Sequence, residues 1–445
     1  MFKKGTIVSI LTVALMVLVI GVATAEDLKP VVFTIEGAFF IPGEADQAIA
    51  DAKEQLESDA LSADKVKDAK GRIRNMELMQ AFMNEAGYTL VGEDWGWAEQ
   101  LQQKQTAAFL AGTGPDIMIG ETQMPGYAQS GYLEPFPQWL ADKVKEKVVL
   151  GAYKPMMVDG KIYGIATYPG VNVLFWNKDL LRKAGLDPDK APETWAELLS
   201  NANKITEAGN REFWGGGTYA GPNFGGSLRV GPFMKMTGGG FVDADNNIIF
   251  DHPGNVQALE YIRKLDKNVP PGLAAAPGEG GFWDALMQGR IAYAVDGPWR
   301  YPQAETLGLD FGYSTLPVPE NGNPANVTIG AAFYGIPTYS KNKEGAWKFI
   351  EALIDPEVQE NVKESQLRPP VLKSFGDDPE FQKTYIYTFY KSLASGDVSG
   401  LPTYNKSSAK VWDVFHQAMS KAVVTNMSIE QILEKAQSQA EAIQE

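Results

Sequence analysis

Short apolar runs with the composition of strands alternate with longer segments of helical composition, and this alternation constrains the fold most. Val31–Ile35 is a β-branched run that predicts a first strand. Trp97–Ala111 has helical periodicity, Gly112 ends it, and Asp116–Ile119 follows a Gly-Pro turn as a buried strand. Strands that alternate with helices favour an α/β fold with parallel strands.

Other helices carry their own start signals. Thr194 with Glu197 fits a capping box, and Ser428 with Gln431 fits another at the start of the last helix. Near the N-terminus, Ala45–Gly87 is a helical stretch rich in Ala, Glu, Lys and Gln, and it overlaps the range Gly43–Asn75. We interpret part of this range as an insertion that forms a solvated surface helix.

The first 25 residues have the composition of a secretory signal peptide. Lys3 and Lys4 precede an apolar run, Ile7–Ile20, and the small residues Ala-Thr-Ala at 23–25 fit a signal-peptidase site. We therefore expect cleavage before Glu26 and a periplasmic or extracellular protein. A retained anchor is the alternative, but the apolar run is short for a membrane span. The chain has no Cys, which excludes lipid attachment through Cys and disulfides.

The charge balance restricts the partners. The chain has 55 acidic and 40 basic residues and a net charge of −15. Binding to a phosphate backbone requires clustered Lys and Arg, so we expect no nucleic-acid partner. The same balance disfavours a strongly anionic ligand.

Signals for metals, cofactors and catalysis are weak. His252 and His416 are the two histidines of the chain and have no metal-ligand spacing, so we interpret both as structural or surface residues. Asp243, Asp245 and Asn247 resemble the start of a calcium loop, but the sixth position lacks the required Gly. A hairpin turn explains them better. We expect no metal, no cofactor and no enzymatic activity.

Four segments occur in an order that one protein family uses. They are Phe109–Gly120 (FLAGTGPDIMIG), Val158–Thr206 (VDGKIYGIATYPGVNVLFWNKDLLRKAGL, then TWAELL), Gly289–Arg300 (GRIAYAVDGPWR) and Gly330–Glu360 (GAAFYGIPTYSKNKEGAWKFIEALIDPEVQE). Together they resemble the extracellular solute-binding proteins of ABC importers, in the branch with the maltodextrin-binding proteins. The resemblance covers about residues 87–442.

This resemblance implies an α/β, two-lobe periplasmic-binding-protein fold with a ligand cleft between the lobes and three hinge crossings. The implied crossings lie near Ala166–Val173, Phe311–Pro317 and Glu364–Pro370. After a signal peptide at 1–25, the implied lobes are 26–168 plus 316–365 for lobe one and 172–312 plus 369–445 for lobe two.

The function implied is capture of a mono- or oligosaccharide by hinge closure and delivery to the permease subunits of an ABC transporter in the membrane. We expect a monomer. One alternative is the same scaffold with a non-sugar solute, such as a polyol, an amino acid or a peptide. Another is an exported glycoside hydrolase, which needs two carboxylates across one cleft.

Aromatic residues are candidates because the C–H faces of a sugar stack on aromatic rings. The resemblance makes Trp299, at the end of the IAYAV strand, a platform for a sugar ring, and Trp412 a second stacking ring. Trp176 is interpreted as a core residue. The remaining aromatic candidates for ligand binding are Trp95, Tyr168, Phe224 and Tyr334.

Polar candidates come from loops at the ends of strands, where side chains can bond sugar hydroxyls. They are Glu36, Glu121, Gln123, Asn172, Asn223, Asp296 and Arg368. The maltodextrin pattern has an aromatic residue, Asp and Arg after its equivalent of DIMIG. This chain has Glu121 and Gln123 there, a departure that leaves the sugar class in place but not maltose itself.

Overall fold

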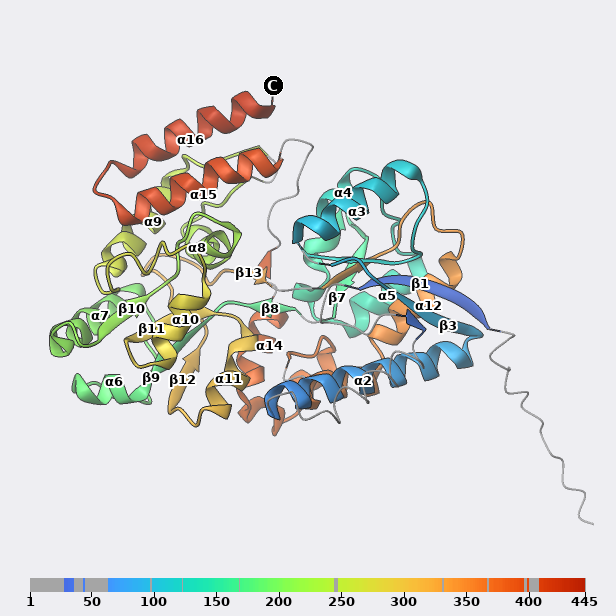
Figure 1. Cartoon of the computed structure of the whole chain (residues 1–445), viewed down its shortest axis with the longest axis horizontal. Helices are drawn as coiled ribbons and strands as arrows, with labels where there is room; N and C mark the ends of the chain where they lie inside the picture. Colours follow the sequence, from blue (N-terminus) through green and yellow to red (C-terminus); the bar gives the residue numbers. More distant parts are fainter. Residues whose placement is uncertain are drawn as a thin grey trace, which may run out of the picture.

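The computed structural model describes residues 28–35, 43–44, 63–96, 98–121, 123–167, 169–243, 247–329, 332–365, 368–395, 398–399 and 408–444. The expected signal peptide, Glu36 and Tyr168 lie outside this part of the chain. Two groups of helices and strands lie side by side, with β8, β13 and α14 between them (Figure 1). The expected two-lobe α/β fold is confirmed.

Lobe one contains two small sheets that are linked to each other. A single parallel bridge between Phe33 and Ile117 links the β1–β3 pair to the β4–β14–β7 sheet. The strands are β1 (Lys29–Ile35), β2 (Gly43–Glu44), β3 (Tyr88–Asp94), β4 (Met118–Gly120), β7 (Gly164–Ala166) and β14 (Phe333–Gly335), with a small hairpin of β5 (Met157–Val158) and β6 (Lys161–Ile162). The helices are α2 (Ala63–Glu85), α3 (Ala98–Ala111), α4 (Met124–Gln129), α5 (Gln138–Lys147), α12 (Lys343–Leu353) and α13 (Pro356–Ser365).

Lobe two has a four-stranded sheet in the order β10-β11-β9-β12. Its strands are β9 (Val173–Asn177), β10 (Trp214–Gly217), β11 (Ile291–Asp296) and β12 (Phe311–Ser314). Its helices are α6 (Lys178–Lys183), α7 (Trp195–Gly209), α8 (Phe224–Met236), α9 (Pro253–Asp266), α10 (Gly280–Met287), α11 (Tyr301–Thr306), α15 (Ser408–Val424) and α16 (Ile429–Gln444).

The sheets are mixed, whereas the sequence predicted parallel strands. β1 and β3 are parallel, as are β10 and β11, but β9 pairs antiparallel with both β11 and β12. β14 likewise pairs antiparallel with β4 and β7. The reason is the lobe crossings: β9 enters lobe two and β12 leaves it, so their directions oppose.

The first crossing is hydrogen-bonded to the strand that follows the second crossing. β8 (Gly170–Val171) pairs antiparallel with β13 (Asn326–Ile329), which also pairs with β15 (Val398–Ser399). The Asn172 backbone N–H donates to Oδ1 of Asn326 at 3.1 Å, and Nδ2 of Asn326 donates to the Asn172 carbonyl at 2.8 Å. This reciprocal pair of hydrogen bonds joins the first crossing to the segment that follows the second crossing.

The segment after the third crossing packs against both lobes. Val149 donates its backbone N–H to the Val371 carbonyl at 2.9 Å, and the backbone of Leu393 in α14 (Tyr385–Ser395) lies against Gly151. On its other side α14 contacts lobe two: the ring of Phe389 lies 6.5 Å from that of Phe175 in β9, and Tyr385 stacks on Tyr301. The expected lobe-two segment 369–445 therefore begins with a portion that contacts both lobes.

Helix α2 is more buried than the sequence predicted. Ile73, Met76, Met79 and Met83 lie on one face and are buried in the core of lobe one. The Gly71 carbonyl of the same helix accepts a hydrogen bond from Asn361 at 2.8 Å. The described part of the expected insertion is therefore not a solvated helix. Its many charged residues made it look solvent-exposed in the sequence.

Other local predictions are confirmed. Thr194 and Glu197 form the expected capping box, and the Gln431 N–H donates to Oγ of Ser428 at 3.2 Å. Trp176 is buried. Asp243 accepts from the Asn247 N–H at 2.8 Å in the expected turn, whose Asp245 lies outside the described residues.

Both histidines have structural surroundings. The His252 side chain caps α9. His416 is buried, and burial lowers its pKa to about 4. Within the described ranges, no helix is long and apolar enough to cross a membrane, and no cluster of three or more His, Cys, Asp or Glu could hold a metal ion.

Candidate ligand-binding site

A cavity of about 300 Å³ brings together residues from both lobes and from the third crossing. Glu121 comes from lobe one, Trp299 from lobe two and Arg368 from the third crossing. The full lining is Glu121, Phe224, Gly225, Leu228, Arg229, Glu279, Trp299 and Arg368. Four residues predicted from the sequence therefore meet here: Glu121, Phe224, Trp299 and Arg368.

Trp299 is positioned by the end of β11. The strand ends at Asp296, and the chain turns through Gly297 into a single 3-10 turn at Pro298–Arg300. A Cβ atom at Gly297 would lie 2.3 Å from the Trp299 ring, so the ring lies directly against this glycine. The Arg368 guanidinium carbon is 5.8 Å from the ring centroid, a cation–π geometry. The ring is partly buried and lines the cavity.

Glu121 follows β4 in lobe one, and Gln123 shapes its loop. The Glu121 backbone N–H donates to Oε1 of Gln123 at 3.2 Å, and Nε2 of Gln123 donates to Gln105 at 3.3 Å. Gln123 is buried and does not line the cavity. It is therefore a positioning residue in this structure.

The carboxylate of Glu121 lacks a hydrogen bond or ion pair within the described part of the chain. Burial, and secondarily the negative charge of Glu279, raise the pKa of Glu121 to about 7. A mostly buried carboxylate without a donor is unfavourable, because water no longer solvates it fully. The position suits a ligand that brings hydrogen-bond donors.

An arginine network holds the opposite wall. Arg229 is 2% exposed, and its guanidinium bonds Glu279 at 2.7 Å and Asp296 at 2.6 Å. Nε of Arg300 bonds the second Asp296 oxygen at 3.0 Å. Both oxygens of Asp296 are thus occupied by protein groups. Asp296 fixes the end of β11 beneath Trp299 and does not line the cavity.

Two predicted amide side chains also have structural partners. Asn223 caps α8, with its Oδ1 accepting from the Gly226 N–H at 3.1 Å and its Nδ2 donating to the Tyr219 hydroxyl. Asn172 is fully buried, and its Nδ2 donates to the Leu228 carbonyl at 3.0 Å. Asn223 therefore lies next to Phe224, which lines the cavity. Asn172 lies at the first crossing.

Three predicted aromatic residues lie away from the cavity. Tyr334 is fully buried in lobe one, with its ring 5.3 Å from that of Phe349. Trp412 is buried in lobe two, 4.9 Å from the ring of Phe241. Trp95 packs against a side cluster of lobe one, and its Nε1 donates to Glu93 at 3.0 Å. Strand and helix position alone did not distinguish these core rings from a ligand platform.

Two lining residues with charge, Arg229 and Glu279, were missed from the sequence. Arg229 is the single charged residue in the apolar stretch FGGSLRVGPFM of α8. A charged residue in a buried helix needs a partner, so this position could have been identified as part of a polar cluster. Nothing local marks Glu279, because its partners are distant in the chain.

The sequence profile of bacterial extracellular solute-binding proteins matches residues 71–360. The chain belongs to this family. Among its relatives, the galactooligosaccharide-binding protein of Bacillus subtilis (strain 168) is 26% identical over 280 residues, which cover 62% of this chain and 64% of the relative. The maltooligosaccharide ABC transporter solute-binding lipoprotein of Streptococcus pneumoniae (strain ATCC BAA-255 / R6) is 25% identical over 365 residues, covering 78% and 80%.

Solved structures of the solute-binding fold agree with the two-lobe architecture. The cyclic α-maltosyl-1,6-maltose binding protein of Arthrobacter globiformis superposes with a TM-score of 0.69 at 20% identity. The match covers 94% of this chain and 99% of that protein. At this identity, the likeness concerns the fold alone.

Proposed function

We propose that this solute-binding protein captures a mono- or oligosaccharide in the cavity lined by Trp299 and Glu121 and delivers it to the permease of an ABC transporter. The relatives named above, which bind oligosaccharides, support the sugar class. The observation that carries the proposal is the pairing of an aromatic face with charged hydrogen-bonding groups from both lobes in one cavity.

Each part of the cavity matches one property of a sugar. The apolar C–H face of a pyranose ring stacks on the Trp299 indole, and its hydroxyls donate to Glu121 and accept from Arg368. The volume of about 300 Å³ lies at the low end of the usual range for ligand pockets. This favours a short saccharide over a long dextrin.

Ligand binding is coupled to lobe closure in this proposal. A sugar that touches Glu121 and Trp299 contacts both lobes, so it binds the closed state better and shifts the population towards it. The closed protein then presents its two lobes together to the permease. We propose that it acts as a monomer and performs no chemistry on the sugar.

The proposed location is outside the cytoplasm. Lys3, Lys4 and the apolar run that follows support export, with cleavage before Glu26. Mass spectrometry of the secreted protein tests this step. A mature chain that begins at Glu26 supports it, and a retained segment or a different start contradicts it.

Calorimetric titration with a carbohydrate panel tests the function. The panel contains glucose, galactose, maltose, maltotriose, a galactooligosaccharide, the linear polyol ribitol and free amino acids. We expect saturable binding of at least one ring sugar and weaker binding of ribitol, which lacks a flat ring face. A protein that binds ribitol or an amino acid and no sugar contradicts the sugar class.

The hydrolase alternative rests on the two carboxylates of the cavity, Glu121 and Glu279. Glu279 is bound by Arg229 at 2.7 Å, which disfavours its use as a base or a nucleophile. Chromatography of each oligosaccharide after prolonged incubation with the protein decides between the two functions. Unchanged sugar supports capture, and accumulation of shorter products supports hydrolysis.

A further inference from the structure

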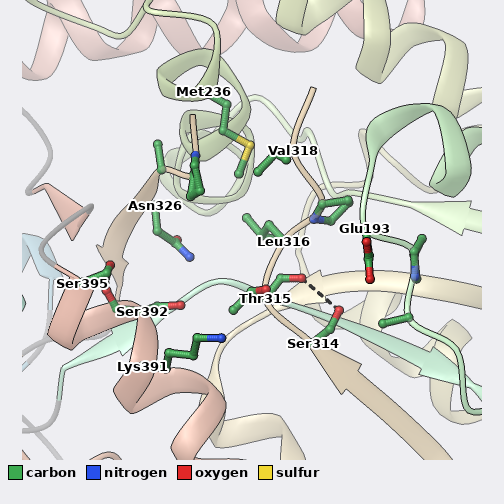
Figure 2. A pocket seen from close by; sticks show the side chains of 15 residues that line it. Glu193, Met236, Ser314, Thr315, Leu316, Val318, Asn326, Lys391, Ser392 and Ser395 are labelled. Carbon is green, nitrogen blue, oxygen red and sulfur yellow. Dashed lines mark hydrogen bonds between the residues drawn. The ribbon is translucent and has the colours of Figure 1, made fainter. Parts of the chain in front are cut away.

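A second cavity, of about 480 Å³, lies on the second crossing and shares no lining residue with the first. Residues 314–318 of the crossing run through it, the loop 191–193 of lobe two forms one side, and three residues of α14 form another (Figure 2). Neither the family relationship nor the proposed sugar site gives this cavity a role.

Part of the apolar surface of the cavity is formed by the second crossing itself. Leu316, Val318 and Met236 contribute apolar side chains, and Ser314, Thr315 and Ser392 add hydroxyl groups. A ligand with an aliphatic portion would bury that portion against these side chains. Without a ligand, these apolar side chains stay in contact with water.

Two opposite charges lie on opposite sides of the cavity. Figure 2 shows Lys391 on the α14 side and Glu193 on the side of the 191–193 loop. Neither side chain has an ion pair or a hydrogen bond within the described residues. Glu193 is held through its backbone, whose N–H donates to Glu197 at 2.7 Å and whose carbonyl accepts from Val318 at 3.1 Å.

Both side chains are exposed and therefore solvated in the ligand-free protein, so a ligand with a single charge would pair with one of them and a ligand with two opposite charges with both. Figure 2 shows the two charged groups on different sides of the cavity, which favours a ligand whose own charges lie at opposite ends of its chain. We propose that this cavity binds a linear zwitterion whose ammonium and carboxylate groups lie at opposite ends of an apolar chain, the chemistry of an ω-amino acid. The carboxylate bonds Lys391, the ammonium bonds Glu193, and the methylene chain lies on Leu316.

The probe for this site is 5-aminopentanoate, titrated into the full mature protein by calorimetry. Three compounds serve as matched controls. Pentanoate lacks the ammonium, pentylamine lacks the carboxylate, and valine is an isomer of the probe with both charges on one carbon. We expect saturable binding of the probe, and binding of each control weaker by roughly tenfold or more, because each loses one charge-assisted hydrogen bond.

Variants then locate the site. Lys391→Gln and Glu193→Gln should each weaken the probe roughly tenfold or more, since each removes one charge. Lys391 also lines a neighbouring cavity together with Lys373, so Lys373→Gln is the matched control and should leave binding unchanged. Trp299→Ala in the sugar cavity should also leave it unchanged. Thermal unfolding of each variant checks that its fold is intact.

Three results would overturn the proposal. The first is the absence of saturable binding of 5-aminopentanoate up to about 10 mM, where a useful site would give a signal. The second is equal affinity for pentanoate or valine, which would make the cavity a general anion or amino-acid site. The third is loss of probe binding in Trp299→Ala with retention in Lys391→Gln, which would assign the probe to the sugar cavity.

Discussion

Glu121 of lobe one and Glu279 of lobe two line the same cavity, and burial, together with the negative charge of Glu279, raises the pKa of Glu121 to about 7. Glu279 is neutralised by Arg229, whereas the carboxylate of Glu121 has no bonding partner among the described residues. Such an unpaired buried group is unfavourable for the ligand-free protein, and a sugar hydroxyl would relieve it. The relationship leads to two predictions about pH.

Glu121→Gln should stabilise the ligand-free protein at alkaline pH. The pKa of Glu121 is raised when folded, so between its ordinary value near 4.5 and about 7 the unfolded chain loses its proton first and stability falls as pH rises. Glutamine removes this penalty, and we expect a gain of about 1–3 kcal/mol in the free energy of unfolding at pH 8 and little change at pH 4. Chemical denaturation at both pH values measures it.

Sugar affinity should rise with pH in the wild-type protein. A hydroxyl donates to the ionised carboxylate, so binding requires the deprotonated form of Glu121, whose pKa is about 7 before the ligand arrives. Calorimetry at pH 6 and pH 8 should show affinity about five- to tenfold higher at pH 8. Glu121→Gln should bind more weakly at pH 8 and lose most of the pH dependence. An unchanged pH profile in the variant would exclude Glu121 as the titrating group.

The same substitution at two tryptophans should have opposite consequences. Trp299→Ala should weaken sugar binding by about 1.5–4 kcal/mol with a modest effect on stability, because the ring lines the cavity. Trp412→Ala should lower the free energy of unfolding by about 3–5 kcal/mol, because that ring is buried against Phe241 and Phe415. Its sugar affinity, measured on the folded fraction, should stay within about threefold of wild type.

Gly297 should be intolerant of even one methyl group. The backbone there is extended, so alanine introduces no torsional strain, but its Cβ would lie 2.3 Å from the Trp299 ring and displace it. Gly297→Ala should therefore weaken sugar binding in the same direction as Trp299→Ala. Gly281→Ala is the control, because a Cβ there meets no atom within 4 Å. Equal sugar affinities of Gly297→Ala and Gly281→Ala would contradict this account of the platform.

Much of the fold was predictable because its signals are local. The capping box at Thr194 and Glu197 and the strand that ends before Trp299 depend on residues a few positions apart. Antiparallel pairing of β9 with β12 and the packing of α14 between the two lobes were not predictable in this way, because they depend on contacts between distant segments.

Part of the candidate site was predictable, because the segments that resemble the solute-binding family carry some of its residues at their ends. Glu121, Phe224, Trp299 and Arg368 meet in one cavity, as expected for residues at strand ends and crossings. Tyr334 was misleading, because the same aromatic residue types serve as buried core rings and as platforms for a sugar ring. Glu279 was missed, since its role depends on the distant Arg229.

Small-angle X-ray scattering with and without the best sugar of the panel tests the central claim most directly. Glu121 and Trp299 belong to different lobes, so a sugar that bonds both should draw the lobes together. The account predicts a smaller radius of gyration at saturating sugar, and a smaller change in Trp299→Ala at a sugar concentration that only just saturates the wild-type protein. A radius that is unchanged at saturation in the wild-type protein would contradict capture by closure of the two lobes.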